Sequence, residues 1–296
     1  MKFHLITSSL QDQTVHDLLK KACEMQAIDF VLHDVENMDM FELPVLGADD
    51  LLYRQTVSRK AVEAQRKMIT AECSTFNTDW RYSFSSRAPS YFIHEKYGFP
   101  TIPSFSGIPN SEEELQMCIE QLGPFPLIIK VLGSSLGVGV MKVDSIESMR
   151  SVLDYLKSIR VNVLVRKYID HEYYVRAVVV GDKVVASHAA FTISQEFRTN
   201  AGDDTHQKRE ARVLSPELQA LIVESVRVMG METGGVDLLF DKDGKPYIAE
   251  VNFPNNFSTT QRITGVDIAS EMVAYLVNKA KIKLGEVSQI ELLVKV

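Results

Sequence analysis

The stretch Gly234–Asn256, GGVDLLFDKDGKPYIAEVNFPNN, decides the fold of this chain. Two apolar runs, Val236–Phe240 and Tyr247–Val251, flank the dipeptide Asp243-Gly244. Asp-Gly between two such runs is a strong signal for a β-hairpin with a two-residue turn. We therefore predict an antiparallel hairpin that closes at this dipeptide.

The register that follows from this turn brings acidic side chains together. Asp237 faces Glu250, and Asn252 lies two residues further along on the same face. Because like charges directly opposed on a sheet are destabilising, two facing carboxylates indicate a bound cation. Carboxylate and amide oxygens without His or Cys suit a hard ion such as Mg²⁺. The opposite, core-facing side would carry Val236, Leu238, Phe240, Tyr247, Ala249 and Val251.

The alternative interpretation of this segment is an ordinary hairpin whose polar side faces water. A turn longer than two residues would also slip the register by one. Such a slip would place Asp237 and Glu250 on opposite faces of the sheet. The remaining motifs of the chain bear on this choice.

Composition excludes several classes of protein. The chain has 296 residues and 45% hydrophobic content, enough for two globular domains. Its 32 basic and 39 acidic residues give a net charge of −7, so no broad positive field favours nucleic acid. The three cysteines form no CxxC or Cys/His cluster, which argues against zinc and disulfides. With no signal peptide and no run of membrane-spanning length, we expect a cytoplasmic protein without a membrane partner.

The N-terminal part reads as a β-α-β unit. We predict a strand over Phe3–Thr7, a helix capped by Ser8 and Ser9 and running to about Gln26, and a strand over Ile28–Leu32. This pattern favours a small open α/β domain, but no Gly-rich turn follows the first strand, so a dinucleotide fingerprint is absent. Two further helices are predicted in this part, Val57–Thr70 and Ala88–Tyr97.

A proline-rich stretch, Pro100–Asn110, separates this part from the rest and is interpreted as a linker. The predicted domains are residues 1–103, residues 104–283 and a tail, 284–296, that includes an edge strand at Ile290–Val296. The predicted elements of the second domain are helix Ser111–Gln121, strands Pro126–Lys130 and Val140–Val143, helix Ser145–Ile159, strand Val161–Ile169, a hairpin of Tyr174–Val180 and Val184–Phe191, a polar loop Thr192–Arg212, helix Pro216–Met231 and helix Asp267–Lys279.

A glycine-rich loop, GSSLGVG, follows the strand that ends at Lys130. Gly133, Gly137 and Gly139 would let the backbone approach phosphate groups closely. The loop lacks the Gly-Lys-Ser/Thr of a Walker motif, and a strand follows it instead of a helix. The alternatives are a plain turn and a solvated strand-end lysine.

The loop Thr192–Arg212 carries Arg198 and Asn200. A solvated connection is the default interpretation, although loops of this length in a compact domain are usually functional or disordered. We predict that this loop is a lid that brings the charge of Arg198 to the site when it closes. The histidines show no spacing typical of a metal site, so we interpret His171, His188 and His206 as structural or surface residues.

The ordered set of motifs resembles the ATP-grasp superfamily, most closely the RimK-type carboxylate–amine ligases. Between Arg87 and Lys279 it comprises IIKVLGSSLGVGV, VLVRKYI, VRAVVVGDKVVA, FRTN, GGVDLL, EVN and TGVDIA. The resemblance implies an α/β N-terminal domain followed by an ATP-grasp fold, in which two α+β lobes clamp ATP. It also implies amide-bond formation through an acyl phosphate, with release of ADP and phosphate.

The same resemblance implies the site residues. ATP would be bound by Arg87, Lys130, Gly133, Ser134, Ser135, Gly137 and Gly139 at its phosphates, by Lys167, Tyr168 and Ile169 at its adenine, and by Glu172 at its ribose. The acyl phosphate or substrate would be faced by Arg176, Arg198 and Asn200. Magnesium, or manganese in its place, would be held by Asp237, Glu250 and Asn252.

The sequence also departs from the family pattern. The family usually has lysine where Arg87 stands and acids where Lys167 and Tyr174 stand. After Asn252 it often has Ser-Pro-Gly, whereas this chain has Phe253–Asn256. That segment borders the acceptor site, so the carboxylate (small molecule or peptide), the amino-acid-like amine and assembly into a homo-oligomer stay open.

Two other functions compete with a ligase. An ATP-grasp kinase acting on a polyol or inositol phosphate would need a strongly basic acceptor pocket, and the net charge of −7 gives no indication of one. A non-catalytic nucleotide-binding protein would have no need of the set formed by Asp237, Glu250 and Asn252.

Overall fold

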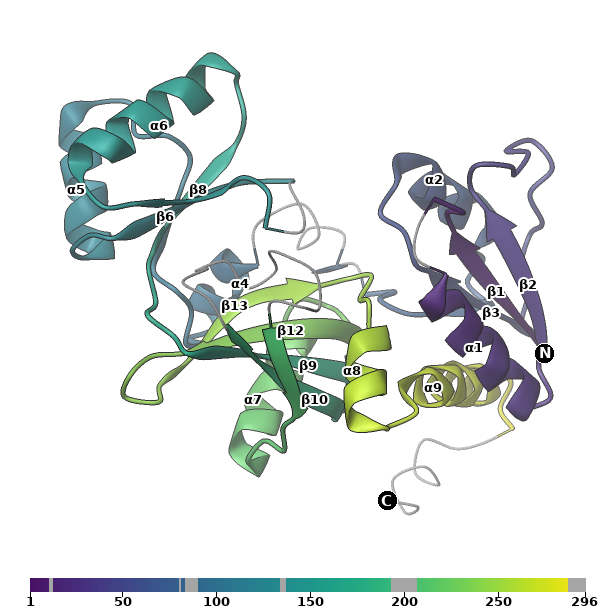
Figure 1. Ribbon diagram of the computed structural model, residues 1–296. Coiled ribbons are helices and arrows are strands. Elements are labelled where there is room, and N and C mark those ends of the chain that lie inside the picture. Colours follow the sequence, from purple (N-terminus) through teal and green to yellow (C-terminus); the bar gives the residue numbers. More distant parts are fainter. Residues whose placement is uncertain (11–12, 80, 83–89, 134–136, 193–206, 287–296) are drawn as a thin grey trace.

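Three β-sheets with their helices make up the computed structural model (Figure 1). The structure describes residues 1–10, 13–79, 81–82, 90–133, 137–192 and 207–286. The predicted site residues Arg87, Ser134, Ser135, Arg198 and Asn200, and the predicted tail strand, lie outside the described residues.

The N-terminal sheet is parallel, with strand order β2-β1-β3-β4. It contains the predicted β-α-β unit, but the first helix begins later than expected. Ser8 does not cap it, because its hydroxyl donates to Glu36 Oε1 at 2.8 Å, and Gln13 precedes the first helical residue. The elements are β1 (Lys2–Thr7), α1 (Thr14–Met25), β2 (Asp29–Asp34), β3 (Asp50–Arg54), α2 (Arg59–Met68) and β4 (Ser74–Thr75).

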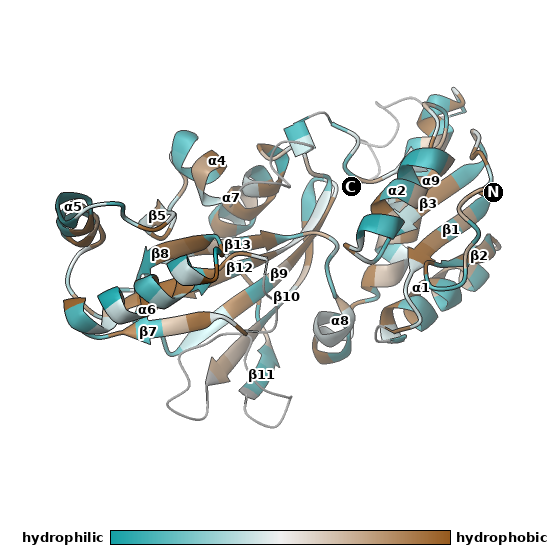
Figure 2. Cartoon of the chain, turned by 90° about the horizontal axis from the view of Figure 1, so that it is seen from above, coloured by the Kyte–Doolittle hydropathy of each residue, from teal (hydrophilic) through white to brown (hydrophobic). Residues whose placement is uncertain are grey.

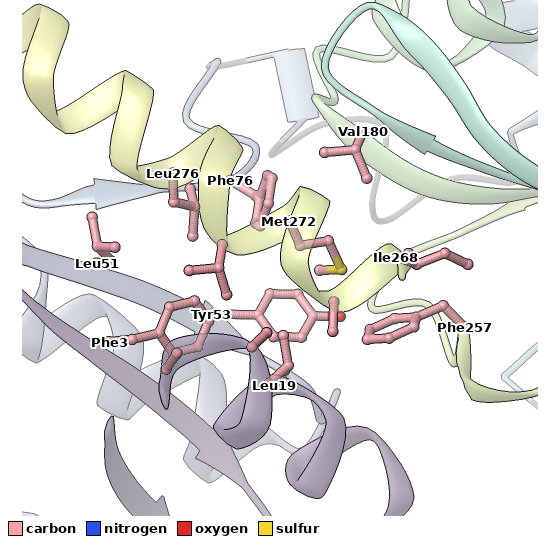
Figure 3. Packing of buried hydrophobic residues seen from close by; sticks show 14 of the residues in the cluster. Phe3, Leu19, Leu51, Tyr53, Phe76, Val180, Phe257, Ile268, Met272 and Leu276 are labelled. Atoms are coloured by element: carbon pink, nitrogen blue, oxygen red, sulfur yellow. The ribbon is translucent and has the colours of Figure 1, made fainter. Parts of the chain in front are cut away.

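The last described helix, α9 (Ile268–Lys283), packs on this same sheet beside α1. Asp267 caps it, since its carboxylate accepts from Ser270 N at 3.1 Å. Figure 3 shows how side chains of α9 meet side chains of β1, α1 and β3 in one apolar cluster. The first strand and the last helix therefore share a core. Its labelled members include Phe3, Leu19, Leu51, Tyr53, Ile268, Met272 and Leu276.

A four-stranded antiparallel sheet of order β5-β8-β6-β7 forms a small lobe with helices α5 and α6. The stretch Pro100–Asn110, which we predicted to be a linker, contains one of its strands. Ser104–Ser106 pairs with β8 at the edge of the sheet, a place where nearby prolines are tolerated. The elements are β5 (Ser104–Ser106), α5 (Glu112–Leu122), β6 (Leu127–Val131), β7 (Val140–Val143), α6 (Ile146–Ser158) and β8 (Val163–Lys167).

The largest sheet is antiparallel, with order β11-β10-β9-β12-β13 and helix α7 against one face. The loop predicted over Thr192–Arg212 contains β11 near its end, and helix α8 was not predicted. Strands β9, β10 and β12 are largely apolar, whereas β11 is polar and the helices carry polar residues on one side (Figure 2). The elements are α4 (Tyr91–Lys96), β9 (Tyr173–Val180), β10 (Lys183–Thr192), β11 (Gln207–Ala211), α7 (Pro216–Arg227), β12 (Thr233–Phe240), β13 (Pro246–Asn252) and α8 (Ser258–Thr264).

The hairpin of β12 and β13 confirms that Asp237 faces Glu250. The two-residue turn was wrong, because the strands end at Phe240 and resume at Pro246. A register shift next to Asp237 compensates for the longer turn, which is how a β-bulge works. Between the bulge and the turn the faces are exchanged: Tyr247 and Ala249 pack with Leu239, not with the predicted core face.

Candidate active site

One row of side chains crosses the whole large sheet on the face toward the small lobe. The pairing register places one member on each strand, from β11 to β13. Paired residues of neighbouring strands point to the same face and lie within contact distance. We call these residues the cross-sheet row: Ala211, His188, Arg176, Asp237 and Glu250.

Arg176 and Asp237 form a buried ion pair at the centre of the row. The guanidinium binds both carboxylate oxygens, Nε to Oδ1 and Nη2 to Oδ2, the latter at 2.8 Å. Their side chains are only 16% and 6% exposed. Burial raises the pKa of Asp237, and Arg176 opposes that rise. Such a two-point charged contact fixes both groups in position.

Two cations of the small lobe contact the end of the row. Lys130 Nζ, on β6, lies 3.0 Å from Glu250 Oε2. Arg166 on β8 donates from Nη1 to Ala249 O at 3.1 Å. Burial lowers the pKa of Arg166 to about 10, so it stays charged at neutral pH. Arg166 was not predicted; the signal for it was a charged residue inside the apolar strand Val163–Lys167.

The glycine-rich loop begins directly after Lys130. Gly133, Gly137 and Gly139 have φ values of 86°, 72° and 75°. This left-handed region is unfavourable for residues with a side chain, so the loop needs glycine at these positions.

The three predicted metal ligands come together at the row. Asn252 donates from Nδ2 to Asp237 Oδ2 at 3.3 Å, and Glu250 is paired directly with Asp237. Two carboxylates and an amide suit a hard divalent ion, so the donor set fits magnesium. No group of three or more His, Cys, Asp or Glu side chains that could hold a metal occurs within the described ranges. The set therefore depends on the amide as its third ligand.

The predicted hinge residues line the junction of the lobes. Lys167 N donates to Pro103 O at 3.0 Å, and Lys142 Nζ lies 4.7 Å from the ring centre of Tyr168. Ile169 is buried among apolar side chains of the large sheet, and Glu172 is exposed. The adenine and ribose roles of these residues stay predictions.

The segment Phe253–Asn256, which departs from the family pattern, supports Arg176. Asn255 is buried, and its Oδ1 accepts from Arg176 Nη1 at 3.4 Å. A Cβ on Gly235 would overlap that oxygen, so the glycine makes room for the contact. Phe253 packs against Tyr53 of the N-terminal sheet, with ring centres 6.1 Å apart.

His188, which we interpreted as a structural or surface residue, is buried and is a member of the cross-sheet row. A turn at Gly181-Asp182 alone would pair Ser187 with Arg176. A register shift between Val184 and Ala186 instead brings His188 opposite Arg176. This register shift has no clear signal in the sequence, so the pairing of His188 with Arg176 was not predicted.

The chain is similar in sequence and in fold to several known proteins. Residues 97–276 match the model of a RimK-like ATP-grasp domain. A probable alpha-L-glutamate ligase of Legionella pneumophila is 33% identical over 245 residues, covering 81% of this chain and 76% of that protein. One of the same description from Picosynechococcus sp. is 27% identical, covering 85% and 81%. The structure of the ATP-grasp ligase PsnB with its minimal precursor has a TM-score of 0.74 at 16% identity, covering 94% of this chain and 99% of that one.

Proposed function

Because the chain belongs to the RimK-like ATP-grasp family, we propose that it is an ATP-dependent carboxylate–amine ligase. The observation that carries the proposal is the cross-sheet row together with Lys130. It aligns a phosphate-binding cation, two metal-binding carboxylates and a fixed arginine along one line. In the reaction, ATP phosphorylates the carboxylate, an amine attacks the acyl phosphate, and an amide, ADP and phosphate are released.

The residues act mainly by positioning and by neutralising charge, as phosphoryl transfer requires. Lys130 and the glycine-rich loop hold the phosphates, and Ile169 and its neighbours form an apolar floor for the base. Arg176 faces the carboxylate that becomes phosphorylated. Asn255 keeps the guanidinium in place through Nη1.

Asp237, Glu250 and Asn252 are the residues that would hold magnesium, or manganese in its place. A divalent ion there would neutralise charge on the transferred phosphoryl group. Arg176 and Lys130 already compensate the two carboxylates, so the chain's own cations keep this acidic pair stable.

The substrates that we propose are an amino-acid-like amine and a small-molecule or peptide carboxylate. Support comes from the two relatives, each described as a probable alpha-L-glutamate ligase. Family membership favours amide formation over the polyol or inositol phosphate kinase and over a non-catalytic nucleotide-binding protein.

We also propose a cytoplasmic setting and a domain boundary at 103/104, where β5 begins the small lobe. Two helices pack across this boundary, α4 against the large sheet and α9 against the N-terminal sheet. Three buried, unpaired cysteines, Cys23, Cys73 and Cys118, support a reducing compartment. Separately, none of the helices in the described ranges is long and apolar enough to cross a bilayer.

The test is a screen of amino acids and short peptides with MgATP and hydroxylamine, which captures acyl phosphates as hydroxamates. We expect ADP, phosphate and a hydroxamate for the true carboxylate, and an amide when the amine replaces hydroxylamine. AMP as the stoichiometric product, or transfer of phosphate to a polyol, would contradict the proposal.

A further inference from the structure

In the cross-sheet row, His188 lies on the side of Arg176 that is away from Asp237 and Glu250. The order along the row is Glu250, Asp237, Arg176 and then His188, with Lys130 beyond the first. On the proposed function this is also the order of the reaction: phosphate, metal, acyl phosphate and, last, the incoming amine. His188 is therefore the described titratable side chain that the pairing register places directly beside Arg176, on the side away from Asp237.

The imidazole is held by one nitrogen only. His188 is 3% exposed, and its Nδ1 lies 3.0 Å from Thr260 Oγ1, a fully buried hydroxyl on α8. Within the part of the chain that the structure describes, Nε2 has no hydrogen-bond partner. In the tautomer in which Nδ1 donates to the Thr260 hydroxyl, Nε2 carries a lone pair.

The surroundings keep this ring neutral. Burial, and then the charges of Arg176 on β9, Arg209 on β11 and Arg262 on α8, lower the pKa of His188 to about 4. A ring with this pKa is neutral at pH 7, so its lone pair is free, but it becomes an effective base only when its pKa rises. Anionic substrates bound among these arginines would offset their charges and make the ring more basic.

The other described groups on this part of the sheet are committed elsewhere. Asp237 binds Arg176, and Glu250 binds Lys130. Tyr174 stands where the family has an acid, but burial raises its pKa, so it stays protonated and cannot act as a base.

We propose that His188 Nε2 is the general base that takes the proton from the attacking amine. The amine lone pair forms the C–N bond at the acyl carbon, and an N–H proton passes to Nε2. The C–O bond to phosphate then breaks, and its electron pair leaves with inorganic phosphate. His188 afterwards releases the proton to water.

The test compares amine and hydroxylamine as nucleophiles in His188→Gln, using the carboxylate and amine with the highest wild-type turnover in the screen above. Hydroxylamine is already unprotonated at neutral pH and needs little help from a base. General-base catalysis is typically worth about 10²–10⁴ in rate, so amide formation should fall by at least about 10²-fold. Hydroxamate formation should be nearly unchanged, and amide formation by the variant should recover as pH rises.

A second pair of variants guards against failure to fold. Thr260→Val removes the hydroxyl that orients the ring and should lower amide formation more than hydroxamate formation, whereas Thr260→Ser should restore both. Equal loss with both nucleophiles, or wild-type amide formation in folded His188→Gln, would overturn the inference. A wild type that yields neither product with any member of the screen would instead overturn the proposed function itself.

Discussion

Glu250 makes its strongest contact with a residue of the other lobe, Lys130, at 3.0 Å. Its side chain is 39% exposed, so it contributes little to folding stability. A change at this residue therefore tests chemistry with little effect on the fold.

We predict that Glu250→Gln lowers turnover by about 10²–10³ while leaving the fold intact, because a charged ligand for the metal and a partner of Lys130 are lost. Asp243→Asn, the same change at the exposed tip of this hairpin, is the matched control and should be neutral. Steady-state kinetics measures the turnover of both variants, and circular dichroism checks that they are folded. A folded Glu250→Gln enzyme with normal turnover would refute the ligand assignment.

His4 and His33 meet inside the N-terminal sheet. His4 Nδ1 lies 2.9 Å from His33 Nε2, and His4 Nε2 lies 3.1 Å from Asp50 Oδ1. Burial, and then the proximity of His4, lowers the pKa of His33 from 6.5 to about 4.

The unfolded chain therefore takes up a proton at His33 below about pH 6.5, whereas the folded chain resists it down to about pH 4. Stability should fall as pH drops through this window, by about 1–2 kcal/mol from this group, because solvent screens a partly exposed ring. His33→Gln, which keeps a hydrogen-bonding amide, should reduce the loss. Urea unfolding at several pH values measures it. Because His188 titrates in the same range, the test compares the pH dependence of the unfolding free energy in His33→Gln and in the wild type. An identical pH dependence in the two proteins would contradict the prediction.

Strands and helices with strong periodicity could be predicted from the sequence, and so could the facing pair Asp237 and Glu250. The pair was predicted correctly because two unpredicted features cancel. The turn is longer than two residues, and the β-bulge next to Asp237 shifts the register back. The second register shift, near Val185, also could not be predicted from the sequence. The position of His188 opposite Arg176 was therefore not predicted. Periodicity fixes which residues alternate, but a single extra residue in a strand exchanges the faces beyond it. Short elements such as β5 (SFS) and α8 (STTQRIT) were missed because they are short and mostly polar.

The N-terminal sheet, the large sheet and α9 are joined by one charged network. Lys279 Nζ lies 2.6 Å and 2.7 Å from the two Glu232 oxygens and 3.0 Å from Thr75 O. Tyr275 and Asn77 donate to the same carboxylate at 2.9 Å. The network therefore joins segments that lie 204 residues apart in the sequence.

Lys279→Met should lower the free energy of unfolding by about 1–3 kcal/mol, because it leaves a partly buried carboxylate without its cation. Lys183→Met, which removes the exposed partner of Glu271, is the matched control and should cost about 0–1 kcal/mol. Urea denaturation of both variants provides the comparison. Equal effects would show that the Lys279 network contributes no more than a surface ion pair.

The core shared by the first strand and the last helix has a consequence for synthesis. The ribosome makes the chain from its N-terminus, so the apolar side chains of Phe3, Leu51 and Tyr53 emerge long before Ile268–Lys283 can cover them. The sheet whose strands are made first is thus the last to be completed. Until then the apolar face that α9 covers stays open, and a nascent chain stopped before α9 would be prone to aggregate through it.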